Sequence, residues 1–184
     1  MKKQNILNLV LAALFAVLVF VGTVSFSIAL PFGYFNLGDG FLLLAAWILG
    51  GYYATAGAAL GAALADAILG FVIYAPATLI IKALMVIVAF QIPKFISKDK
   101  PLFRFTGYFT SSVLAELLMV AGYYLFEAAL YGFGAALTSV PGNLLQGAAA
   151  VIIGNIVISV LDSTGLLKKI MPQRHTIKNK EIKP

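Results

Sequence analysis

Residues 73–93 read IYAPATLIIKALMVIVAFQIP, an apolar run with a single charged side chain, Lys82, near its middle. Runs of this length and hydropathy are typical of helices that cross a membrane. An ionisable group inside such a helix is costly unless it is paired or hydrated, and it is therefore a candidate functional residue. The stretch predicts a membrane-spanning helix in which Lys82 has a specific partner.

The composition of the whole chain indicates the same environment. Of the 184 residues, 61% are hydrophobic and only 11% are charged, and the mean hydropathy is +0.98. A water-soluble domain cannot bury so large an apolar fraction. We therefore expect an all-α integral membrane protein.

Hydrophobic runs divide the chain into six expected transmembrane helices in one membrane domain, residues 1–170, followed by a basic tail, residues 171–184. The expected helices cover residues 5–29, 37–49, 52–71, 77–92, 105–131 and 140–161. The second and fourth are short and span a bilayer only if flanking residues extend them or the bilayer thins. The first run also follows two lysines, as in a signal peptide, but it is longer than a typical signal sequence.

The basic residues indicate an orientation. Twelve of the thirteen Lys and Arg residues lie before the first expected helix, between the fourth and fifth, or after the sixth. If six helices alternate, these segments share one side of the membrane, and Lys and Arg accumulate on the cytoplasmic side. Both termini are therefore expected in the cytoplasm, with anionic lipid headgroups as neighbours and no nucleic-acid partner.

Polar side chains on the last three expected helices predict a pocket that opens to the outside. Helical spacing brings these residues to shared faces: Thr78 and Lys82; Ser112, Glu116, Tyr123 and Glu127; Asn143 and Gln146. A pocket that is mostly apolar, with a few convergent polar groups, suits a small ring compound.

Two of these positions have structural alternatives that stay open at the level of sequence. Lys82 either contacts a ligand or pairs with Glu116 or Asp66 and only fixes the packing of the helices. Asn143 is explained equally well as the residue that caps the start of its helix.

Small residues recur at four-residue spacing in the first and third expected helices. Gly57 and Gly61 form a GxxxG pattern, and Ala12 and Ala16 form an AxxxA step. Small residues let helices approach closely in lipid. Internal packing accounts for most of the GxxxG pattern, whereas AxxxA is a weak signal in a chain so rich in alanine.

Enzyme signatures are missing from the sequence. It contains no GxxxxGK[ST] phosphate loop and no HExxH motif, and its one histidine, His175, lies in the polar tail. An intramembrane enzyme would need a nucleophile beside a base, which no serine here has in sequence. A self-sufficient carrier that uses Asp66, Lys82 and Glu116 as an ion relay is a further alternative, but no clear internal repeat supports it. We expect a protein without enzyme activity, cofactor or metal.

The order of motifs resembles the substrate-binding S component of energy-coupling factor (ECF) vitamin transporters. After the AxxxA step come YFNLGDGFLLLAAWILG at 34–50, GAALGAALADAILGFVIYAPATLIIKALM at 57–85 and SVPGNLLQ at 139–146. The strings NLGD and ALAD…YAPATLIIK are far more specific than AxxxA. The resemblance covers residues 5–165 and is best to the subgroup that includes riboflavin, pyridoxine and hydroxymethylpyrimidine carriers.

This resemblance implies a multi-pass protein of the prokaryotic plasma membrane that captures a vitamin or precursor from outside. It implies as partners a membrane coupling subunit and two cytoplasmic ATPases, which use ATP. The ligand-side residues, taken from matching motifs and from helical periodicity, are Asn36, Tyr74, Thr78, Lys82, Glu116, Tyr123, Asn143 and Gln146, and the partner-side residues are Ala12 and Ala16. The small polar inventory favours pyridoxine or hydroxymethylpyrimidine over riboflavin.

Overall fold

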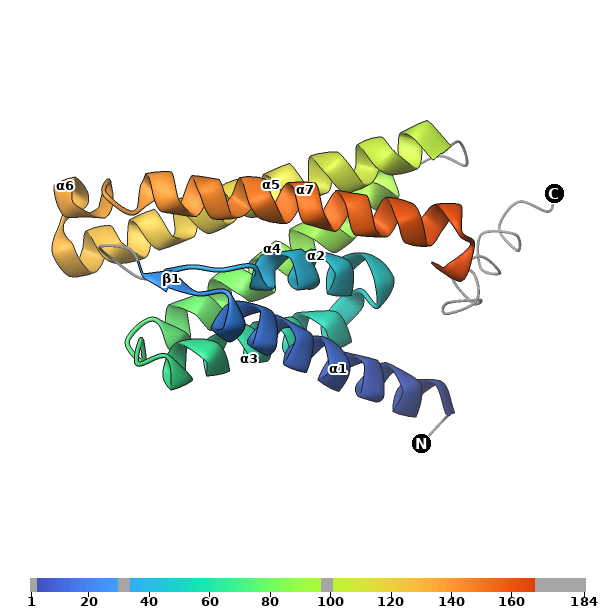
Figure 1. Ribbon diagram of the computed structural model, residues 1–184, viewed down its shortest axis with the longest axis horizontal. Helices are drawn as coiled ribbons and strands as arrows, with labels where there is room; N and C mark the ends of the chain where they lie inside the picture. Colours follow the sequence, from blue (N-terminus) through green and yellow to red (C-terminus); the bar gives the residue numbers. More distant parts are fainter. Residues whose placement is uncertain (1–2, 30–33, 97–100, 168–184) are drawn as a thin grey trace.

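The computed structural model describes residues 3–29, 34–96 and 101–167, and these form an almost entirely helical protein (Figure 1). The helices are α1 (Lys3–Ser25), α2 (Gly38–Ile48), α3 (Gly51–Ile68), α4 (Ala75–Ile96), α5 (Pro101–Tyr131), α6 (Phe133–Ala136) and α7 (Val140–Ser163). A short antiparallel hairpin, β1 (Ile28–Ala29) and β2 (Tyr34–Phe35), connects α1 to α2. The expected tail at 171–184 lies outside the described residues.

The six expected helices correspond to α1 to α5 and α7. Four segments are long and apolar enough to cross a membrane: Gln4–Ser25, Ala75–Ile96, Arg104–Tyr131 and Phe133–Ser163. The expected shortness of the fourth helix is wrong, because α4 continues to Ile96 and its 22 residues reach about 33 Å. The prediction of six complete spans is not confirmed, since α2 has only 11 residues.

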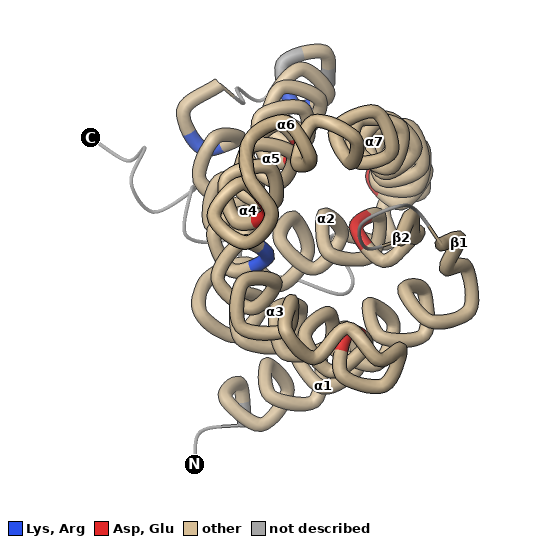
Figure 2. The backbone as a smooth tube through the Cα atoms, turned by 90° about the vertical axis from the view of Figure 1, so that its left-hand side faces the viewer, with Lys and Arg blue, Asp and Glu red and all other residues tan. Residues whose placement is uncertain are grey.

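Helix α2 lies in the middle of the bundle. It contacts α1, α3, α4 and α7, and the end-on view shows it between the α1–α3 side and the α5–α7 side (Figure 2). All of its residues except Phe41 are buried. An apolar helix too short to span a bilayer can keep this depth because protein surrounds it. The largest fully buried side chains of the core include Leu42 and Leu43 of α2.

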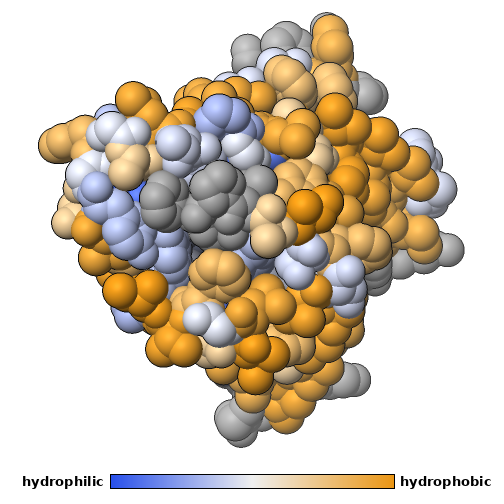
Figure 3. Space-filling model, turned by 60° about the vertical axis from the view of Figure 1, so that its left-hand side comes forward, coloured by the Kyte–Doolittle hydropathy of each residue, from blue (hydrophilic) through white to orange (hydrophobic). Residues whose placement is uncertain are grey.

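The outer surface is apolar, as a lipid-facing surface must be. Hydrophobic residues dominate much of the surface in Figure 3, and hydrophilic residues gather in one region of that view. Large apolar side chains are exposed along the long helices, for example Val10, Val17, Ile80, Leu117, Leu125, Ile152 and Ile156. A soluble monomer rarely exposes so much contiguous apolar area.

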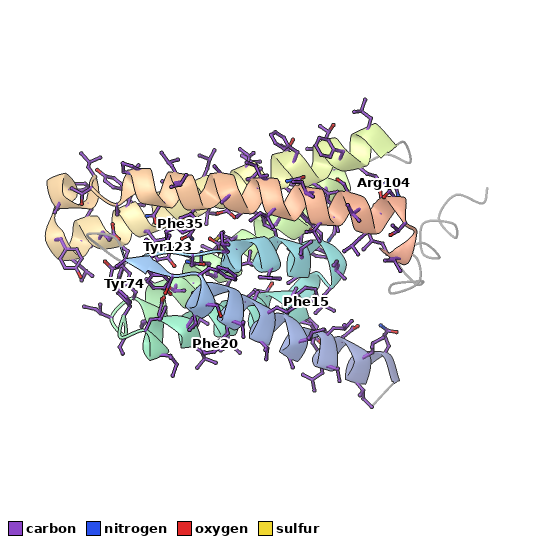
Figure 4. All side chains as sticks on the ribbon, viewed as in Figure 1. Phe15, Phe20, Phe35, Tyr74, Arg104 and Tyr123 are labelled. Atoms are coloured by element: carbon purple, nitrogen blue, oxygen red, sulfur yellow. The ribbon has the colours of Figure 1, made fainter. Side chains whose placement is uncertain are left out.

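The ends of the helices agree with the expected grouping of basic residues. Helix α1 begins and α7 ends at the same end of the molecule (Figure 1). Arg104, near the start of α5, lies at that end too and pairs with Asp162 at 3.1 Å (Figure 4). Which side of the membrane this end faces stays a prediction.

The small residues of α1 and α3 face each other. A β-carbon on Gly57 would lie 2.5 Å from the carbonyl oxygen of Ala12, and one on Gly61 would collide with the carbonyl oxygen of Ala16. Ala12 is only 7% exposed. Helix α3 of the same chain thus packs against the backbones of Ala12 and Ala16, with Ala12 buried and Ala16 half-buried, and a partner-docking role for these residues stays a prediction.

Candidate substrate-binding site

A cavity opens at the end of the molecule where the hairpin, the α3–α4 connection and the start of α7 meet. The empty space between its lining residues, open mouth included, is about 470 Å³. Seven of the eight expected ligand-side residues line it: Asn36, Tyr74, Thr78, Lys82, Tyr123, Asn143 and Gln146. Figure 4 shows Tyr74 and Tyr123 at this end, near Phe35 of the hairpin.

An ion pair forms the base of the cavity. Lys82 Nζ lies 2.6 Å from Oδ1 of Asp39, the acidic residue of the NLGD string in the first turn of α2. The expected pairing of Lys82 with Glu116 or Asp66 is therefore wrong, because the buried α2 brings Asp39 to the lysine first. The ammonium group also lies 5.5 Å from the centroid of the Tyr123 ring, in range of a cation–π contact.

Gln146 of α7 links this ion pair to the hairpin side of the cavity. Its Nε2 donates to Asp39 Oδ2 at 2.6 Å. Its Oε1 accepts from the backbone N–H of Asn36 at 2.9 Å and from Asn36 Nδ2 at 3.0 Å. Residues from α2, α4, α7 and the segment before α2 thus form one buried hydrogen-bonded unit.

Asn36 also fixes the start of α2. Its Oδ1 accepts from the backbone N–H of Gly38 at 2.9 Å, and Thr23 Oγ1 of α1 lies 3.4 Å from the same atom. A β-carbon at position 38 would clash with the Thr23 hydroxyl and lie 3.0 Å from Asn36 Oδ1. The glycine in NLGD is needed because no larger residue leaves room for this turn.

Aromatic side chains form one wall nearer the mouth. The Tyr34 and Phe71 ring centroids lie 5.1 Å apart, and Tyr74 meets Phe71 edge-on at 6.0 Å. The Tyr34 hydroxyl donates to Asp66 Oδ1. Burial, together with the nearby charge of Asp66, raises the pKa of Tyr34 above its usual range, so this hydroxyl stays protonated and remains a donor. Such a wall suits stacking against a planar ligand.

Three further polar contacts connect α5 to α4 and to the residues that precede α4 and α7. The hydroxyls of Thr78 and Tyr123 lie 2.8 Å apart. The Tyr74 hydroxyl donates to Glu127 Oε1 at 3.4 Å, and Ser139 hydrogen-bonds the other carboxylate oxygen of Glu127. These contacts hold the side chains of the cavity in fixed directions.

Asn143 differs from its neighbours because the structure gives its side chain no hydrogen bond among the described residues. The residue that precedes α7 is Ser139, and no side chain caps that helix. The alternative reading of Asn143 as a cap is therefore wrong. Its half-buried side chain lines the cavity and is available to a ligand.

Glu116 does not line this cavity, which corrects its place among the ligand-side residues. It lies seven residues before Tyr123 on α5, about 10 Å deeper at 1.5 Å per residue. It is 4% exposed, and neither carboxylate oxygen has a hydrogen-bond partner among the described residues. It lies instead at the bottom of an apolar groove between α5 and α7, next to Gly147.

Several cavity residues were not expected from the sequence. They are Thr23, Tyr34, Ala62, Asp66 and Phe71, with Asp39 beneath them, whereas Glu127 belongs to the polar face already expected for the fifth helix. The acidic residues could have been identified from the sequence, because a carboxylate inside an apolar segment is a functional candidate by default. Thr23 and Ala62 could not, since only the packing of α1 and α3 brings them to the cavity.

A family model for the ECF-type riboflavin transporter S component matches residues 3–163. The chain belongs to this family. The match begins at the first residue of α1 and ends at the last residue of α7, so it covers the whole bundle. A comparison with curated proteins found no match.

Membership in the S-component family indicates what the protein does. This S component is a substrate-capture subunit of a vitamin transporter, and its family is one of transporter subunits and not of enzymes. Its long apolar helices agree with a multi-pass membrane protein.

Proposed function

We propose that this S component captures a small heteroaromatic vitamin or precursor, pyridoxine or hydroxymethylpyrimidine, from the outer side of a prokaryotic plasma membrane. The observation that carries the proposal is the cavity at the hairpin end, which combines a wall of aromatic rings with a polar base. A planar ring fits against the wall, and its substituents reach the polar groups.

Lys82 is expected to serve both the fold and the ligand. An ammonium group has three N–H donors, and the structure assigns one of them to Asp39. Because Lys82 also lines the cavity, another donor is available to a ligand oxygen. The side-chain amide of Asn143 can bind the same ligand without first breaking a hydrogen bond within the protein.

Riboflavin is the second candidate ligand, because the family description names it. The few polar groups that line the cavity favour the smaller rings, which carry fewer hydrogen-bonding substituents. Direct titration of the purified protein with pyridoxine, hydroxymethylpyrimidine and riboflavin ranks the three. Submicromolar binding of riboflavin alone would overturn our choice.

The same proposal includes the partners. We expect a membrane coupling subunit and two cytoplasmic ATPases to supply the energy, with no cofactor bound in this chain. The rival reading is a self-sufficient ion-coupled carrier. Uptake of the ligand into liposomes that contain this chain alone, without ATP, would favour the carrier, whereas binding without uptake supports the capture subunit.

Asn143→Ala tests the site itself. Loss of one hydrogen bond to the ligand is worth about 0.5–1.5 kcal/mol, so we expect the affinity to fall about 2- to 12-fold with no change in folding. Asn5→Ala is the matched control, because Asn5 is exposed at the far end of α1. Unchanged affinity in Asn143→Ala would remove this residue from the ligand contacts.

A further inference from the structure

The cavity holds more carboxylates than cations. Asp66 of α3 and Glu127 of α5 face it, and Lys82 of α4 is the one basic residue among its described lining residues. The hairpin and α7 contribute only neutral polar groups. Lys82 forms its direct ion pair with Asp39 beneath it, and neither Asp66 nor Glu127 has an ion-pair partner within the described part of the chain.

Asp66 still needs a hydrogen-bond donor. It is 4% exposed, and Oδ1 accepts the bond from Tyr34. No described residue lies in hydrogen-bonding geometry to Oδ2. A buried acceptor without a partner costs free energy that a ligand donor recovers on binding.

Glu127 lies on the other side of the cavity and has no cation either. It is 2% exposed, and its oxygens bond the hydroxyls of Tyr74 and Ser139. These neutral contacts orient the carboxylate but leave its charge uncompensated. Two acidic groups on different helices thus face the same ligand space.

We propose that Asp66 and Glu127 determine the form of the ligand, a proposal that rests on the function proposed above. The cavity accepts a heteroaromatic vitamin as its free alcohol, with an N–H or O–H donor directed at Asp66 Oδ2. It rejects the phosphate ester of the same compound. Specificity of this kind comes from repulsion of the competitor as well as attraction of the ligand.

The physical reason is the charge of the ester. A phosphate monoester carries about −1.5 to −2 charges at pH 7, and repulsion between like charges is stronger in a buried site than in water. Lys82 could donate a further N–H to a phosphate oxygen, but its single positive charge is already balanced by the buried carboxylate of Asp39, so it does not offset the charge of the ester. A phosphorylated vitamin outside the cell would therefore need hydrolysis before capture.

The test compares each alcohol with its phosphate ester: pyridoxine, hydroxymethylpyrimidine and riboflavin against their monophosphates, titrated into the purified full-length protein at pH 7. We expect the ester of the bound vitamin to bind at least tenfold more weakly. Equal affinity of alcohol and ester would overturn this inference and leave the proposed function standing. Failure of all three alcohols to bind would instead overturn the proposed function.

Two variants test whether the two carboxylates cause the preference for the alcohol over its phosphate ester. Asp66→Asn and Glu127→Gln are each expected to lower the ratio of alcohol to ester affinity severalfold. Asp162→Asn is the matched control, because Asp162 pairs with Arg104 at the opposite end of the molecule, and its ratio should equal that of the unmodified protein. If Asp66→Asn does not fold, Glu127→Gln carries the test, and an unchanged ratio in the folded variants would overturn the assignment.

Discussion

Lys82 and Asp39, 43 positions apart in the chain, form a buried ion pair with 2.6 Å between Nζ and Oδ1. The pair joins α4 to the first turn of α2, and Gln146 of α7 donates to the second oxygen of the same carboxylate. The lysine that stands out in the apolar run is therefore part of a unit that fixes three helices beneath the cavity.

Lys82→Met is expected to destabilise the protein as well as weaken ligand binding. Removing one partner of a buried ion pair typically costs about 3–5 kcal/mol, because the other charge stays buried. The free energy of unfolding, measured in mixed detergent micelles, should fall by an amount in this range.

Asp39→Asn combined with Lys82→Met is the control for that loss. The double variant removes both charges, so we expect it to be more stable than the sum of the two single effects, with an interaction free energy of about 0.5–3 kcal/mol. Additive effects would show that the two residues do not act as a pair.

Gly61→Ala is expected to separate α1 from α3. The added methyl group would collide with the carbonyl oxygen of Ala16, and overpacking of this kind costs about 1–3 kcal/mol. Since α1 and α3 also position Thr23 and Asp66 at the cavity, ligand affinity should fall together with the melting temperature in detergent.

Ala13→Leu is the matched variant for the same helix pair. Ala13 is exposed on α1, so added bulk there should leave the melting temperature and ligand binding unchanged.

Ala12→Leu should instead reduce binding and uptake together, because Ala12 is buried against α3. Normal binding in Ala12→Leu with loss of uptake would support the partner-docking role expected for that position.

Glu116→Met is expected to stabilise the protein. Both carboxylate oxygens of Glu116 are buried without a partner among the described residues, and an apolar side chain of similar volume avoids that desolvation cost of about 1–3 kcal/mol. Thermal unfolding in detergent should shift upward while ligand affinity stays constant. A lower melting temperature would reveal a partner for this carboxyl group.

Single cysteines at the two ends of α7 report the orientation. The chain contains no cysteine, so each introduced thiol is the only target. Thr138 and Ser163 are both exposed. An impermeant maleimide added to whole cells should label Thr138→Cys, whereas Ser163→Cys should react only after the membrane is permeabilised. The reverse pattern would place the termini outside.

The helices and the family could be predicted from the sequence. Hydropathy and turn residues act locally, so the expected segments correspond to α1 to α5 and α7, and the NLGD and YAPATLIIK strings indicated the S-component family that the comparison then showed. Helical periodicity also brought Thr78 and Lys82 to one face, and both line the cavity.

Helical periodicity did not predict how deep each side chain lies in the bundle or which residues it contacts. Glu116 and Tyr123 share a face of α5, yet only Tyr123 lines the cavity, because Glu116 lies about two turns deeper, beside Gly147 of α7. The sequence shows which face a side chain occupies but not how far along that face the cavity extends.

The partners of the charged and small residues were decided by the tertiary structure alone. Helix α2 is too short to cross a bilayer, and its burial among four helices brings Asp39 to Lys82 in place of Glu116 or Asp66. The packing of α1 on α3 likewise buries Ala12 and brings the backbone of Ala16 against Gly61. Hydropathy determines that a helix leaves water, but contacts between segments far apart in the sequence determine which partner each buried charge and each small residue meets.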